Sequence, residues 1–189
     1  MATKALTEVE VKKLKAGIQL SRNPERDWAI CSLALSGLRI GETCVIRNGD
    51  LLTEEGKVKE TFSLRASDTK NGKSRLCYIT PAAKKAIEAY LPTKRSIEAD
   101  RPFIESQVNI HEPMAANTAG QIVKKAMKSV GIESSSHSLR KYAATQLRKN
   151  GVDLCIIQRV LSHSSLAITQ RYLQVDETEV ESAMKNLKF

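Results

Sequence analysis

The chain has 189 residues, 41% of them hydrophobic and 27% charged, and its 30 Lys and Arg outnumber 21 Asp and Glu to give a formal net charge of +9 at pH 7. This length predicts a single domain with its own core, and the apolar fraction excludes a disordered chain. No apolar run approaches the roughly 20 residues of a membrane span, and the first residues lack the apolar segment of a secretory signal, so we expect neither. The four cysteines form no CxxC pair and are expected to be buried thiols of a reducing compartment: Cys31, Cys44, Cys77 and Cys155.

The positive charge is concentrated toward the C-terminal end. Residues 121–175 contain nine cationic and two acidic side chains, whereas residues 176–189 contain two and four. A basic segment of this kind is typical of a surface that binds a polyanion, and nucleic acid is the obvious polyanion. A solvated basic face that only keeps the protein soluble is the alternative, so the charge by itself identifies no reaction.

Turn and capping signals recur along the chain and predict mainly helices. A capping box at Thr7 and Glu10 opens the first helix, Asn23 and Pro24 open the second, and Asp153 caps a later one. The expected helices, in chain order, span about 7–20, 24–36, a short run from 41, 81–91, 118–130, 138–149, 153–162, 165–173 and 177–187.

Residues 57–80 depart from the helical pattern. The strings KVKETFSLR and SRLCYIT flank Asn71-Gly72, a dipeptide that favours tight hairpin turns, and so predict two antiparallel strands. One further short strand is expected over 101–104. The predicted fold class is therefore mainly α with a small antiparallel β-sheet, an α+β domain with no internal repeat and no linker that would separate two domains.

Four segments place reactive polar groups where helix packing does not require them. In the first, SGLRIGE at 36–42, two glycines bracket Arg39 directly after a helix. Its guanidinium could bind a phosphate, with Glu42 orienting it, or it could simply cap the helix C-terminus. The second, DTKNGKSR at 68–75, is a hairpin tip with three cations. It is either a solubilised turn or the place from which a lysine donates a proton to a leaving oxygen.

The third and fourth segments follow in the basic part of the chain. His137 and Arg140 stand three residues apart and therefore share one face at the start of a helix. His163 lies in a turn between two helices, and Tyr172 follows one short helix later. Each pattern also has an ordinary explanation: a histidine near a helix N-terminus beside a solvated arginine, and a tyrosine that only packs.

Taken together, the four segments indicate chemistry at a phosphodiester. The chain has no histidine pair at metal-ligand spacing, no GxSxG elbow and no nucleotide-binding motif, so we expect neither a metal nor a cofactor. Arginines and a histidine would stabilise the charge that develops on the phosphoryl oxygens. A tyrosine oxygen would attack phosphorus in line and form a covalent intermediate.

The strings SGLRIGE, HSLRKYAATQLRKNG and IQRVLSHSSLAITQRYL, with the hairpin DTKNGKSR, resemble the signature boxes of the tyrosine recombinase (integrase) family. The resemblance covers about residues 5–176 and implies that residues 1–176 form a catalytic domain of that family's fold. It implies that residues 177–189 form a C-terminal helix suited to docking on a neighbouring subunit. The family's N-terminal DNA-clamping domain is expected to be absent.

The resemblance also implies roles for individual residues. Glu42 would support Arg39. Two residues depart from the family pattern: Lys141, directly after Arg140, and Ser162, directly before His163. Lys73 is a second candidate, beside Lys70, for the general acid. The implied catalytic set is Arg39 and Arg140 on the scissile phosphate, Lys70 as general acid on the leaving 5′-hydroxyl, His137 assisting the tyrosine proton, His163 as a further phosphate-side donor, and Tyr172 as the nucleophile joined to the 3′-phosphate. Further DNA contacts are expected at Lys73, Arg75, Lys141 and Arg171.

The function that these roles imply is site-specific recombination or integration of double-stranded DNA, by cutting and rejoining strands without metal or ATP. The resemblance implies assembly into a synaptic tetramer on DNA, with weak association or a monomer in its absence. It also implies a place in the cytoplasm of a bacterial, phage-infected or archaeal host cell, at the nucleoid. Two alternatives remain open: a type IB topoisomerase-like enzyme that only relaxes DNA, and a decayed recombinase that binds DNA without cutting it.

Overall fold

The computed structural model describes residues 4–69, 71–109 and 111–163, together with 167, 181, 184 and 185. Lys70, Arg171 and Tyr172 lie outside the described residues, as do most of the helices predicted over 165–173 and 177–187. The chain divides into two compact units, Met1–Ala143 and Ala144–Phe189, which we call unit 1 and unit 2.

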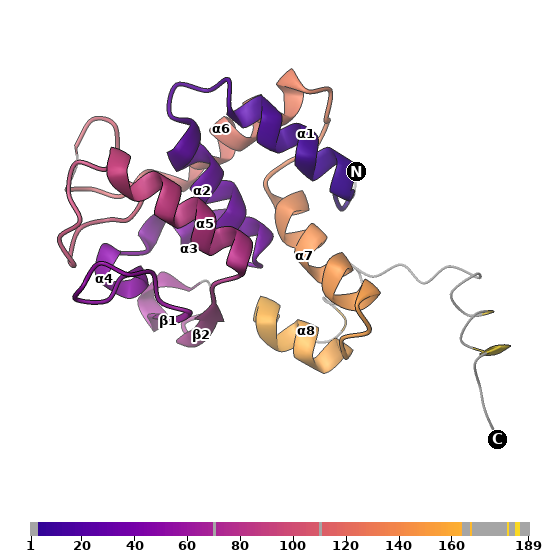
Figure 1. Ribbon diagram of the computed structural model, residues 1–189. Helices are drawn as coiled ribbons and strands as arrows, with labels where there is room; N and C mark the ends of the chain where they lie inside the picture. Colours follow the sequence, from indigo (N-terminus) through magenta and orange to yellow (C-terminus); the bar gives the residue numbers. More distant parts are fainter. Residues whose placement is uncertain are drawn as a thin grey trace. The chain divides into compact units, whose positions relative to one another are not determined.

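Helices predominate in the described part of the chain, as the sequence predicts, and one small sheet accompanies them (Figure 1). In chain order the elements are α1 (Glu8–Ile18), α2 (Pro24–Leu35), α3 (Ile40–Val45), α4 (Asn48–Leu51), β1 (Thr61–Leu64), the 3₁₀ turn η1 (Ala66–Asp68), β2 (Arg75–Tyr78), α5 (Pro81–Tyr90), the 3₁₀ turn η2 (Leu91–Thr93), α6 (Ala116–Ser129), α7 (His137–Lys149) and α8 (Leu154–Leu161).

Caps that are visible in the sequence define several of these helices. The Thr7 hydroxyl accepts a hydrogen bond from the backbone N–H of Glu10 at 3.2 Å, and the Glu10 carboxylate accepts one from the N–H of Thr7 at 2.7 Å, which confirms the predicted capping box. Thr80 and Asp153 accept in the same way from the first turns of α5 and α8. Gly131 follows α6 with a φ of 74°, the left-handed conformation that glycine adopts without steric cost.

Unit 1 is built around α2, the helix that the sequence predicts to be central. It contacts α1, α3, α5 and α6, and Ile30, Cys31 and Leu33 on it are almost fully buried. Within unit 1, α1 and α6 lie at one end and α4, β1 and β2 at the other (Figure 1). Burial of each such Leu or Ile side chain contributes roughly 1.5–3 kcal/mol, so this packing anchors α2 in the unit.

The sheet is a two-stranded antiparallel pair in which Thr61 lies opposite Tyr78. This confirms the predicted pair of strands, but a tight turn at Asn71-Gly72 does not join them directly, because β1 ends at Leu64 and β2 begins only at Arg75. Beyond β1 the chain turns first into η1, where the Asp68 carboxylate accepts a hydrogen bond from Arg65 at 2.7 Å, and only later reaches Gly72 with its φ of 64°. The local ion pair therefore ends the strand before the hairpin turn begins.

Two further local expectations are wrong. Asn23 stands at the N-cap position of α2, but its side chain accepts no hydrogen bond there. Its backbone, at φ −136° and ψ 71°, lacks the extended conformation that directs a capping side chain at the first turn. Residues 101–104 form no strand; Pro102 makes an isolated bridge with Arg47, because proline has no N–H with which to extend the ladder.

Unit 2 contains the second half of α7 and all of α8, with a small core of Ala144, Ile157 and Leu161. Cys155 on α8 is exposed, so the prediction of four buried thiols holds only for Cys31, Cys44 and Cys77. Cys155 lies on the side of the helix away from Ile157, which faces the core.

Candidate functional site

A pocket of about 270 Å³ opens in unit 1 beside the turn that connects α2 to α3. Three of the four segments in which the sequence places reactive groups contribute to it. The lining residues are Leu38, Arg39, Ile40, Gly41, Glu42, Asp68, Ser136, His137 and Arg140.

Arg39 is held at the entrance of α3. Gly37, with a φ of 99°, ends α2 and turns the chain so that Arg39 becomes the N-cap residue of α3. Its Nη1 donates to Oε1 of Glu42 at 2.8 Å, and its backbone N–H donates to Oε2 of the same carboxylate at 2.7 Å. The Arg39 side chain is 26% exposed. A guanidinium held by one partner and still open to solvent has donors left for a phosphate.

Arg140 lies in the first turn of α7 and is buried. Its Nη1 donates to the carbonyl oxygen of Gly37 and lies 4.0 Å from Oε2 of Glu42. The helix that carries Arg140 is thereby tied to the turn that presents Arg39, although about a hundred residues separate the two. The two arginines therefore line one pocket.

Arg75 is a third guanidinium in the same cluster, although the sequence assigns it only to DNA contact. It is the first residue of β2, and its Nη2 donates to Oε2 of Glu42 at 2.7 Å. Its side chain is 11% exposed and that of Glu42 is 3% exposed. The pattern of β2 indicates that Arg75 is shielded, though not that Glu42 is its partner, because Arg75 shares a strand face with the buried Cys77 two residues on.

The electrostatics of this cluster are set by Glu42. Burial raises the pKa of its carboxyl, but the hydrogen bond from the Arg39 N–H and the charges of Arg75 and Arg39 outweigh burial and hold the pKa below its usual value. Glu42 is therefore ionised at neutral pH. With Arg140 at 4.0 Å, three cations surround one anion and leave two positive charges in excess. An anion entering the pocket reduces the repulsion among these cations.

Among the other predicted residues of unit 1, one lines this pocket. His137, the first residue of α7, is exposed and lines the pocket. Lys73 is exposed, and Lys141 is half-buried. Asp68, which the sequence analysis did not single out, also lines the pocket and is held by Arg65. The pocket therefore combines the guanidinium groups of Arg39 and Arg140 with an imidazole.

His163 belongs to unit 2 and is positioned by the end of α8. Its N–H donates to the carbonyl of Gln158 at 3.1 Å, and the Gln158 amide donates back to the carbonyl of His163 at 3.1 Å. Ser162 before it has a φ of 49°, the left-handed conformation, and closes the helix. His163 is 8% exposed.

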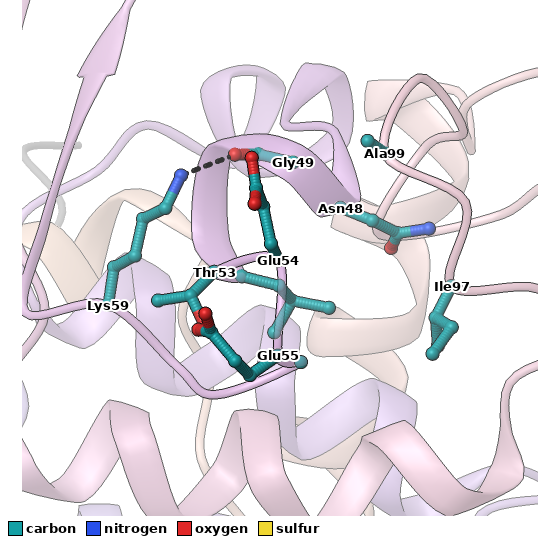
Figure 2. A pocket seen from close by; sticks show the side chains of 10 residues that line it. Asn48, Gly49, Thr53, Glu54, Glu55, Lys59, Ile97 and Ala99 are labelled. Carbon is teal, nitrogen blue, oxygen red and sulfur yellow. Dashed lines mark hydrogen bonds between the residues drawn. The ribbon is translucent and has the colours of Figure 1, made fainter.

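A second, larger pocket of about 870 Å³ lies beside α4 (Figure 2). Glu54 and Glu55 line it, and Lys59, the only cation among its lining residues, already donates to the carbonyl of Gly49 at 2.7 Å. Two carboxylates disfavour a phosphate here, so size does not identify the anion site. Among the described residues, no cluster of three or more His, Cys, Asp or Glu is arranged to hold a metal ion.

Residues 4–179 match the sequence model of the phage integrase family, and the chain belongs to that family. Among curated relatives, "Tyrosine recombinase XerA" of Pyrococcus horikoshii is 32% identical over 185 residues, covering 98% of this chain and 61% of the relative. "Tyrosine recombinase" of Pseudothermotoga lettingae is 32% identical over 181 residues, covering 94% of this chain and 58% of the relative. The chain thus spans about three fifths of the length of these relatives.

Solved structures with the same fold agree with this assignment. The crystal structure of XerA recombinase superposes with a TM-score of 0.77 at 25% identity, covering 98% of this chain and 65% of that one. The catalytic domain of bacteriophage HP1 integrase superposes with a TM-score of 0.61 at 20% identity, covering 98% of this chain and 95% of that one. The structure of XerH recombinase bound to its palindromic difH substrate superposes with a TM-score of 0.74 at 18% identity, covering 96% of this chain and 52% of that one. The predicted family and fold are confirmed.

No helix within the described ranges combines the length and the apolar character that a membrane crossing needs.

Proposed function

We propose that this chain is the catalytic domain of a site-specific DNA recombinase or integrase. The observation that carries the proposal is the pocket in which Arg39 and Arg140 are arranged around the ionised Glu42. Guanidinium groups fixed in place by a buried carboxylate form a preorganised site for a phosphate, since no reorganisation is needed when charge develops on it. Membership of the phage integrase family supports the same chemistry.

In the proposed reaction, Arg39 and Arg140 bind the non-bridging oxygens of the scissile phosphate. The phenol oxygen of Tyr172 attacks phosphorus, and the bond from phosphorus to the 5′-oxygen of the next nucleotide breaks. The tyrosine proton leaves with help from His137, while Lys70 or Lys73 protonates the departing 5′-oxygen. The product is a 3′-phosphotyrosyl bond, and attack by a 5′-hydroxyl reverses the steps, so no net hydrolysis occurs.

The partner in this proposal is double-stranded DNA, to which Lys141 and Arg171 add contacts. Relatives in solved structures support this, since XerH is bound to difH and the Tn1549 transposon integrase to transposon end DNA. We propose that residues 1–176 form the catalytic domain and that residues 177–189 dock on a neighbouring copy in a tetramer assembled on DNA. The location we propose is the cytoplasm, at the nucleoid, where such DNA lies.

The nucleophile is tested by trapping the covalent intermediate. A library of randomised duplexes, nicked on one strand so that the cleaved fragment diffuses away, is incubated with the chain, and DNA that migrates with protein in denaturing gels is recovered and sequenced. We expect recovery of a preferred site and an adduct that Tyr172→Phe abolishes, because the phenol oxygen forms the bond.

The matched control removes another phenol hydroxyl. Tyr78→Phe changes an exposed tyrosine on β2 and should leave the adduct intact. An adduct that survives in Tyr172→Phe would assign the nucleophile elsewhere. Reversible binding without any adduct would support a DNA-binding module, and adducts without strand exchange between two duplexes would support a topoisomerase-like enzyme.

A further inference from the structure

Arg75 is placed to act within the protein rather than on DNA. It is the first residue of β2, where it pairs with Leu64 of β1 in the sheet register. With a side chain only 11% exposed, its guanidinium is turned toward Glu42 and away from solvent. Arg39 and Arg140 line the pocket, whereas Arg75 is not among its lining residues and lies behind Glu42.

The two oxygens of Glu42 have different partners. Oε1 accepts from Nη1 of Arg39 at 2.8 Å, whereas Oε2 accepts from the N–H of Arg39 and from Nη2 of Arg75, both at 2.7 Å. Arg140 approaches Oε2 only to 4.0 Å, beyond hydrogen-bond distance. Arg75 thus makes a direct hydrogen bond to Oε2, whereas Arg140 does not.

The consequence concerns the charge that reaches the pocket. If Arg75 were neutral, Oε2 would attract Arg140 into a direct ion pair, and the cluster would retain one excess positive charge in place of two. A guanidinium committed to a carboxylate binds a phosphate less well, because its donors are already used. Arg140 would also shift from the place where Gly37 now holds it.

We infer that Arg75 is a positioning residue for the proposed phosphate site: by donating to Oε2 of Glu42 it holds Arg140 out of a direct hydrogen bond with that carboxylate and in its place beside the pocket. This inference rests on the proposed function. It assigns to the hairpin a role beyond carrying the general acid, since β2 completes the phosphate site from within the fold.

The test compares Arg75→Gln and Arg75→Lys with the unchanged chain on the nicked duplex recovered from the library. Because a small misplacement of a catalytic group is costly, Arg75→Gln should lower the single-turnover rate of adduct formation by about a hundredfold at saturating DNA. The Kd for the same duplex should change by less than about twofold, and Arg75→Lys should restore part of the rate. Arg101→Gln is the control, since it removes an arginine paired with Glu98 outside the pocket.

A second substrate distinguishes positioning from a general loss of structure. With a neutral methylphosphonate at the scissile position, less charge needs to be stabilised, so the penalty of Arg75→Gln should shrink. If Arg75→Gln lowers the rate of adduct formation equally on both substrates, Arg75 has only a structural role. If it raises the Kd for DNA and leaves the rate at saturating DNA unchanged, Arg75 is a direct DNA contact. If the unchanged chain forms no adduct, the proposed function fails. If the unchanged chain forms the adduct and Arg75→Gln forms it at the same rate, only this inference fails.

Discussion

Glu42 is a buried carboxylate that positions several arginine side chains. It accepts hydrogen bonds from Arg39 and Arg75 and lies close to Arg140, yet only 3% of its side chain is exposed. A buried ion pair contributes little net stability by itself, but removing one partner leaves the others desolvated and unpaired. At the scale of residues, therefore, the stability of unit 1 and the proposed phosphate site depend on the same group.

Glu42→Gln should destabilise the protein by about 3 kcal/mol at neutral pH, because it leaves buried guanidinium groups without their counter-ion. The measurement is urea unfolding followed by the fluorescence of Trp28, the single tryptophan. Glu98→Gln is the control; this partner of Arg101 is 66% exposed, and its loss should cost less than about 1 kcal/mol. Equal losses in the two variants would contradict the importance of the buried cluster.

The pH dependence of stability follows from the same carboxyl. Because its folded pKa lies below the ordinary value of 4.5, ionised Glu42 stabilises the fold above that value, and the contribution is lost as pH falls through the folded pKa. Between about pH 5 and pH 3, unfolding free energy should therefore fall more steeply in the unchanged chain than in Glu42→Gln. Parallel curves would show that other carboxyls account for the acid sensitivity.

At the scale of elements, what the sequence predicts depends on how local the cause is. The capping box at Thr7 and the glycine after α6 are local, and both helices are confirmed. The short α4 was missed, because the burial of Leu51 at its end depends on tertiary packing. The link of Glu42 to Arg75 joins residues 33 apart in sequence, and local patterns carry no such information. The roles assigned to Lys70 and Tyr172 stay predictions.

The crossing of α1 and α6 gives a test at this scale. A Cβ on Gly17 of α1 would lie 2.8 Å from Cγ1 of Val130, closer than real Cβ atoms come, and 3.0 Å from the carbonyl oxygen of Ala126, which is a tight contact. Gly17→Ala should therefore destabilise the protein by about 1 kcal/mol, despite the higher helix propensity of alanine. Gly120→Ala in α6, where the new Cβ would meet no described atom beyond its own helix backbone and chain neighbours within 4 Å, should instead stabilise the protein by about 1 kcal/mol. Thermal unfolding measures both, and shifts of the same sign would contradict the close approach.

At the scale of the whole molecule, the formal charge of +9 predicts binding to DNA through phosphates. Affinity for a fluorescent duplex should fall steeply between about 50 and 200 mM salt. For each phosphate that the protein neutralises, the logarithm of the association constant should fall by about 0.9 for each tenfold rise in salt concentration. Lys73→Ala should reduce this slope by about one, whereas Lys85→Ala on α5, outside the pocket, should leave it unchanged. A flat salt dependence would mean that the basic residues serve solubility alone.

The left-handed serine at the end of α8 has a consequence for how the chain tolerates change. Ser162 holds a φ of 49°, where a residue with a Cβ is about 1 kcal/mol less favourable than glycine. Glycine would relieve that cost, but it would also give the backbone ahead of His163 more conformations to visit. Selection for heat resistance and selection for a fixed imidazole direction therefore favour different residues at position 162, glycine for the first and serine for the second.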